Sequence, residues 1–188
     1  MLRRMARVRN LRPGYTISYP NREKAASKAT KAIVVLLLLV SVVLMLIVTI
    51  GGWSKLEGEQ PLNFFFILAY LIFAFYIWRW QRGLLPMAAA LGIVLLILAV
   101  IAGTGASGTS WFDRTHAGFA APQSLFGGTG LSPDTLGLAT VLMIPIEALL
   151  IFFSMQGFAQ GWNVEVEVPG DQSRRGGAAP SSTAPAAA

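Results

Sequence analysis

Four long apolar runs set what this 188-residue chain can fold into. They cover roughly residues 33–52, 63–78, 84–104 and 136–159. A helix needs about 20 apolar residues to cross the hydrocarbon core of a bilayer. Open strands cannot satisfy their backbone groups in hydrocarbon, so the crossing segments must be helices. The runs therefore predict an all-α membrane protein built as a four-helix transmembrane bundle.

The composition of the segments outside these runs predicts how the chain is divided into an arm, a transmembrane domain and a tail. Only 13% of the residues are charged, against about 25% in soluble domains. We predict a basic arm over 1–31, a transmembrane domain over 32–160 and a tail over 161–188 that is disordered after about residue 169. A long external loop is expected at 105–135, lying against the outer face of the bundle because it carries several large apolar side chains.

The basic residues gather on alternate sides of the runs. Before the first run lie Arg3, Arg4, Arg7, Arg9, Arg12, Arg22, Lys24, Lys28 and Lys31. The same side receives, from the second link and the tail, Arg79, Arg82, Arg174 and Arg175. The other side receives only Lys55 and Arg114. Because basic residues stay in the cytoplasm during insertion, we predict four crossings with the N and C termini cytoplasmic.

The tryptophans support this topology independently. All five lie at the ends of runs, at Trp53, Trp78, Trp80, Trp111 and Trp162. Tryptophan favours the interface between head groups and hydrocarbon. We therefore place Trp53 and Trp111 at the outer interface and the other three at the inner one.

The net charge of +6 points to lipid rather than to nucleic acid. The positive charge lies next to a predicted span, where it attracts anionic lipid head groups. The predicted partners are thus the bilayer and its anionic head groups, with no nucleic acid. The location we expect for this multi-pass protein is the bacterial plasma (inner) membrane.

The third run carries small residues at four-residue spacing, in the pairs Ala88–Gly92 and Ala99–Gly103. Such pairs let two helices approach closely. The alternative interpretation is chance in an alanine-rich helix.

Glu147 is the one acidic or basic residue deep inside a run. A charge at that depth costs roughly 2.5–3.5 kcal/mol on insertion scales. Three arrangements accommodate it: a protonated acid that donates a hydrogen bond, a wet cavity, or a cation from another chain. A protonated Glu147 could donate to the Val141 carbonyl, which Pro145 leaves free, or to a hydroxyl such as that of Ser41. Thr140 and Ser154 lie seven residues to either side of Glu147 and share its helix face, because two turns cover about seven residues. Glu147, Thr140 and Ser154 form a candidate intramembrane polar site.

A second candidate site lies in the external loop, at Asp113, Arg114 and His116. Acid–base or metal chemistry needs several convergent groups, and an exposed polar turn is the alternative interpretation. The chain has no cysteine and one histidine. We therefore predict no catalytic residues, no metal site and no cofactor.

The two ends of the chain receive different predictions. The N-terminal arm is interrupted by Pro13 and Pro20, so we predict an irregular segment followed by a helix from about Arg22. In the tail, valines alternate with polar residues over 162–168, a pattern typical of a half-buried strand. That strand either pairs with the sheet edge of a partner or leaves the membrane extended.

These features favour a non-catalytic accessory or structural subunit of a membrane complex, whose partners are other membrane subunits or copies of itself. The alternative is an oligomeric small transporter or channel that uses the intramembrane carboxylate. A membrane enzyme acting on lipid would need paired acids, histidines or a phosphate-binding basic pocket, and the runs show none of these.

Overall fold

The computed structural model describes residues 14–104, 110–113 and 120–170. Arg114, His116 and the tail beyond residue 170 lie outside the described residues, as do the first thirteen residues of the arm. The elements in chain order are β1 (Tyr15–Ser18), α1 (Pro20–Glu23), α2 (Ala25–Gly51), η1 (Trp53–Lys55), α3 (Gln60–Trp78), η2 (Arg82–Leu84), α4 (Leu85–Thr104), α5 (Pro133–Ala159) and β2 (Val166–Pro169).

Four helices are long and apolar enough to cross a membrane, namely α2, α3, α4 with η2, and α5, which confirms the predicted number. Helix α2 begins at Ala25, ahead of the apolar run, because Lys28 and Lys31 continue its first turns. Lysine is a good helix former, so the helix extends beyond its apolar part. Helix α5 begins as the sequence indicates, with Ser132 Oγ accepting from the Thr135 amide at 3.2 Å.

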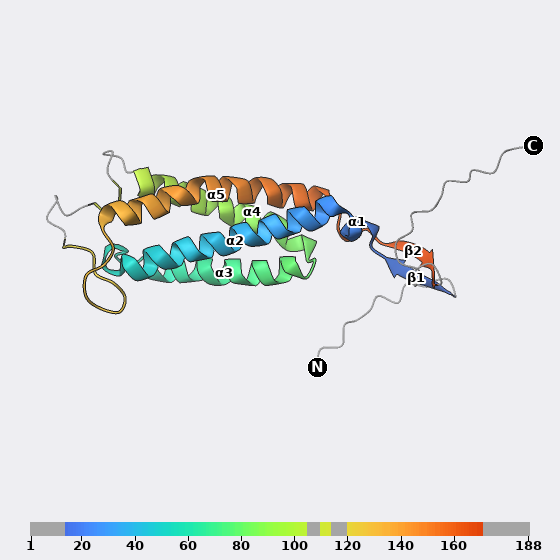
Figure 1. Cartoon of the computed structure of the whole chain (residues 1–188), viewed down its shortest axis with the longest axis horizontal. Helices are drawn as coiled ribbons and strands as arrows, with labels where there is room; N and C mark the ends of the chain where they lie inside the picture. Colours follow the sequence, from blue (N-terminus) through green and yellow to red (C-terminus); the bar gives the residue numbers. More distant parts are fainter. Residues whose placement is uncertain (1–13, 105–109, 114–119, 171–188) are drawn as a thin grey trace, which may run out of the picture.

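The four helices run side by side in an elongated bundle (Figure 1). Helix α2 packs against α3 on one side and against α5 on the other, and α4 packs most extensively on α5. Large apolar side chains also cover the outside, among them Leu36, Phe65, Leu68, Phe75, Ile101, Leu138 and Phe152. Helices that are apolar all round are typical of a membrane span or a deep core.

Small residues bring α4 and α5 close together, which confirms the packing predicted from their spacing. Ala88 and Ala99 are buried in this contact. A Cβ on Gly103 would lie 2.9 Å from Val141 Cγ2 and 3.2 Å from the Val141 backbone nitrogen. The backbones therefore approach so closely at this point that only glycine fits without a shift.

The prediction of an all-helical protein is wrong in one respect, because a segment before the first long helix and a segment after the last one form a small sheet. Strands β1 and β2 pair antiparallel, with Tyr15 opposite Pro169 and Ser18 opposite Val166. The tail does form a strand, but β2 covers Val166–Pro169 rather than the predicted 162–168. It pairs with the chain's own arm, which we had predicted to be irregular. Because the chain passes along the bundle four times, it finishes at the end of the bundle where it began. There the two segments, both rich in residues that favour strands, lie close enough to pair.

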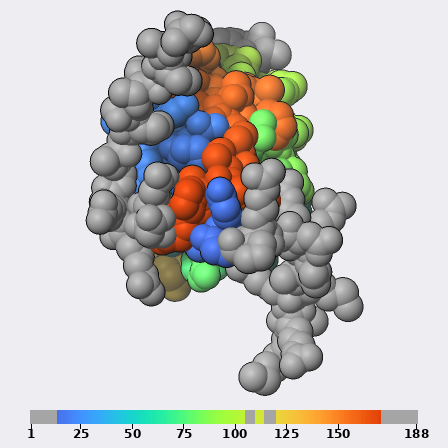
Figure 2. All heavy atoms as spheres, turned by 90° about the vertical axis from the view of Figure 1, so that its right-hand side faces the viewer, coloured from blue at the N-terminus to red at the C-terminus, as the bar shows by residue number. Residues whose placement is uncertain are grey.

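The sheet defines two ends of the bundle. We call the end with β1 and β2 the sheet end, and the end with η1 and residues 120–132 the loop end (Figure 1). Viewed from the sheet end in Figure 2, the start of α2 lies beside the end of α5. At the loop end, the Leu125 and Leu131 amides donate to the Ile50 and Gly51 carbonyls, both at 2.9 Å. The described part of the loop thus lies against the bundle, as predicted.

Replacing Gly103 by alanine should destabilise the bundle by roughly 1–3 kcal/mol, because the new methyl group overpacks the α4–α5 contact. The measurement is reversible unfolding in mixed micelles, followed by helical circular dichroism. Gly83→Ala is the matched control, since a Cβ there meets no atom within 4 Å. Equal stability of the two variants would contradict the close approach.

Candidate functional site

The Glu147 carboxyl group lies in the middle of the bundle and joins three helices. Ser41 on α2 donates its hydroxyl to Glu147 Oε1 at 2.6 Å. Tyr70 on α3 donates its hydroxyl to Oε2 at 2.8 Å. Glu147 itself is 0% exposed on α5. Because serine and tyrosine hydroxyls both donate and accept, this geometry satisfies the acid in either protonation state.

The fourth helix closes over the same group. A Cβ on Gly92 of α4 would lie 3.3 Å from Glu147 Oε2 and 3.2 Å from Ile151 Cγ1. Glycine at this position therefore lets the α4 backbone cover the carboxyl. The Glu147 carboxyl is thus hydrogen-bonded within the chain, and Ser41 is one of the partners considered from the sequence. Ser41 was expected to accept from a protonated acid, whereas in the structure its hydroxyl donates.

Thr140 and Ser154 lie on the buried face of α5 together with Glu147, as their spacing predicts. Neither bonds to the carboxyl. Thr140 Oγ1 donates to the Leu136 carbonyl at 2.9 Å, one turn back along its own helix. Ser154 Oγ is buried and has no hydrogen-bond partner among the described residues. The polar site is therefore built across helices rather than along α5.

Tyr70 is the site residue that sequence reasoning missed, since it was grouped with the other aromatic residues of α3. It is fully buried, with its ring edge-on to Phe66 at 6.2 Å. One signal was available: Ser41 and Tyr70 carry the only hydroxyls near the middle of their runs, at a depth matching that of Glu147. Buried polar groups in hydrocarbon find partners at their own depth.

The external loop site is described only in part. Asp113 follows the buried Phe112, and its amide donates to the Ser110 carbonyl at 2.9 Å. Arg114 and His116 lie outside the described residues, so the proposed cluster stays a prediction. Within the described ranges, no three or more histidine, cysteine, aspartate or glutamate residues come together to hold a metal ion.

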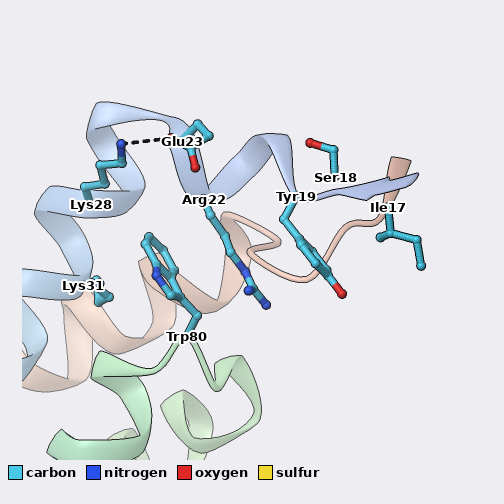
Figure 3. Close-up of a pocket in the computed structure, with 8 residues that line it drawn as sticks. All are labelled: Ile17, Ser18, Tyr19, Arg22, Glu23, Lys28, Lys31 and Trp80. Carbon is cyan, nitrogen blue, oxygen red and sulfur yellow. Dashed lines mark hydrogen bonds and ion pairs between the residues drawn. The ribbon is translucent and has the colours of Figure 1, made fainter. Parts of the chain in front are cut away.

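A second polar site appears at the sheet end, where sequence reasoning indicated only a diffuse basic arm. A cavity of about 620 Å³ opens between β1, the start of α2 and the turn after α3. Its lining residues, drawn in Figure 3, are Ile17, Ser18, Tyr19, Arg22, Glu23, Lys28, Lys31 and Trp80. We call it the basic pocket.

Comparison with known proteins finds no family, no curated sequence and no solved structure similar to this chain.

Replacing Tyr70 by phenylalanine should cost about 0.6–1.7 kcal/mol of unfolding free energy, the range for hydrogen bonds between helices in membrane proteins. The loss arises because Glu147 Oε2 keeps no hydroxyl donor. The measurement is unfolding of the purified chain in mixed micelles.

Tyr76→Phe is the matched control for this prediction. Tyr76 lies on the same helix, is 45% exposed and has no hydroxyl hydrogen bond within the described chain. Its removal should leave stability unchanged within about 0.5 kcal/mol, as is usual for surface positions. If Tyr70→Phe were as stable as Tyr76→Phe, the hydrogen bond from Tyr70 to Glu147 would contribute nothing to the free energy of unfolding.

Proposed function

We propose that the chain is a multi-pass membrane protein whose bundle spans the bilayer, with the sheet end in the cytoplasm. The apolar outer surface of the four helices supports insertion, because so large an apolar surface is unfavourable in water and favourable in lipid. The charge distribution supports the orientation. The described basic residues of the sheet end are Arg22, Lys24, Lys28, Lys31, Arg79 and Arg82, whereas Lys55 is the described basic residue of the loop end.

The aromatic residues support the same placement. Trp80 and Trp162 pack edge to face at the sheet end with ring centroids 5.3 Å apart. At the loop end, the Trp111 indole donates to the Lys55 carbonyl at 3.3 Å. Tryptophan at both ends of the bundle is expected where the ends lie at the two interfaces. We propose the bacterial plasma membrane as the location.

The orientation can be tested cleanly because the chain has no cysteine. Phe126→Cys places a thiol at the loop end, at a side chain that is 84% exposed. Gln81→Cys places one at the exposed turn after α3. In intact cells, an impermeant maleimide should label position 126 and not position 81. Labelling of position 81 before lysis would contradict the proposed topology.

Within the membrane we propose a non-catalytic role, as an accessory or structural subunit that binds another membrane protein. The observation that carries this proposal is the sheet of β1 and β2. It has two strands within the described chain, so each strand has an outer edge to which a further strand can add. Val166 is 42% exposed on this sheet. Two-stranded sheets are marginally stable in water, so pairing with a partner would stabilise this one.

The Glu147 geometry also favours a structural role over transport. The carboxyl on α5 is enclosed by side chains from α2 and α3 and by the α4 backbone. An ion or proton would reach it only after the bundle opened. A partner cation is not required either, since the chain supplies both hydroxyl donors. The support for a partner therefore comes from the sheet and not from the carboxylate.

Purification in mild detergent from native membranes tests this role. We expect a stable complex with another membrane protein in fixed stoichiometry, and Val166→Glu should dissociate it by placing a charge on the sheet. Val164→Glu is the matched control, because Val164 is 47% exposed but precedes the strand. A lone chain, or a homo-oligomer that supports ion flux in liposomes, would contradict the proposal.

A further inference from the structure

Among the described residues that line the basic pocket, positive charges outnumber carboxylates. Among its lining residues are three cations, Arg22, Lys28 and Lys31, and one acid, Glu23. Lys28 Nζ pairs with Glu23 at 3.2 Å at the rim of the pocket (Figure 3). The pair is well exposed, so its mutual attraction is weak. Two positive charges therefore remain among the described lining residues.

Those two cations are held in place by neutral groups. Arg22 Nε donates to the Trp162 carbonyl at 3.1 Å, and Arg22 Nη2 donates to Asn163 Oδ1 at 2.8 Å. Lys31 Nζ lies 3.4 Å from the Trp78 carbonyl. Carbonyl and amide oxygens orient a cation without cancelling its charge. Neither Arg22 nor Lys31 forms an ion pair with a carboxylate in the part of the chain that the structure describes.

Trp80 separates the two cations and forms the apolar wall of the pocket. In Figure 3 its indole stands between Lys31 and Arg22, with Lys31 Nζ 4.1 Å and Arg22 Cζ 5.9 Å from ring centroids of Trp80. Its backbone has φ 65°, in the left-handed region that bulky residues rarely adopt. Trp80 takes this conformation because it terminates α3: its amide donates to the Ile77 carbonyl at 2.9 Å, and the Gln81 amide donates to the Tyr76 carbonyl at 3.1 Å.

We propose that the basic pocket binds the phosphate group of an anionic phospholipid, with Arg22 and Lys31 as its counter-ions and Trp80 against the glycerol and upper acyl region. Guanidinium and ammonium groups are the usual partners of phosphate. A volume of about 620 Å³ lies in the range of roughly 300–1,000 Å³ typical of small-molecule sites.

The position of the pocket selects a lipid rather than a soluble phosphate ester. The pocket opens where the apolar helices end and the polar sheet begins, next to the aromatic group of Trp78, Trp80 and Trp162. On the proposed placement this is the cytoplasmic head-group layer. The inference rests on that placement but not on a protein partner, so the isolated full-length chain is sufficient to test it.

The test is lipid retention by the purified chain in neutral detergent, measured by native mass spectrometry with short-chain phosphatidylglycerol. Phosphatidylcholine and tail-free glycerol phosphate are the comparison ligands. We expect saturable retention of one phosphatidylglycerol per chain, with weaker retention of both comparison ligands. The double variant Arg22→Gln, Lys31→Gln should weaken retention by about fivefold for each charge removed, whereas Glu23→Gln should strengthen it.

Lys24→Gln is the matched control, because it removes one exposed positive charge at the same end outside the pocket lining. It should change retention by less than twofold, and all variants should keep the wild-type circular dichroism. An equal loss per charge removed in Lys24→Gln and in the double variant would overturn the pocket in favour of diffuse attraction. Equal retention of glycerol phosphate would overturn the lipid assignment and leave a soluble phosphate ester as the ligand.

Discussion

The hydrogen bonds of one carboxyl group fix how the four helices fit together. Apolar helices in lipid have little hydrophobic drive to associate, because lipid tails are as apolar as leucine. Glu147 replaces that drive with directional contacts to Ser41 and Tyr70, and Gly92 lets the remaining helix approach. On the proposed placement in lipid, the Tyr70 hydroxyl would lie unpaired without the carboxyl, so this one arrangement is favoured over rotated or shifted alternatives.

The two ends of the bundle depend on that fixed interior but differ in character. At the loop end, backbone amides of the connecting segment cap the carbonyls at the end of α2. At the sheet end, basic and aromatic side chains surround a cavity, and β1 pairs with β2. Arg22 links these features, since it lines the cavity and bonds to the segment that follows α5. Lipid binding and partner binding are thus proposed for adjacent parts of one end.

Hydropathy and spacing predicted much of this structure. The number of long helices and the buried face of α5 followed from local patterns. Ser41 was named only as one possible partner of Glu147, and as an acceptor rather than the donor that it is in the structure. The role of Tyr70 did not follow from a local pattern, because α3 is apolar on every face and its pattern does not say which side faces inward. Strand β1 was missed because four residues acquire their strand partner more than 140 positions away. The basic pocket was missed for the same reason, since its walls come from separate segments of the chain.

A double-mutant cycle between Tyr70→Phe and Glu147→Leu tests the central claim most directly. Each single variant removes one partner of the same hydrogen bond, so their effects on unfolding free energy should not add. The structure predicts a coupling energy of about 0.6–1.7 kcal/mol in mixed micelles. Strictly additive losses would show that Glu147 and Tyr70 do not interact, and would contradict the account of how the bundle is held together.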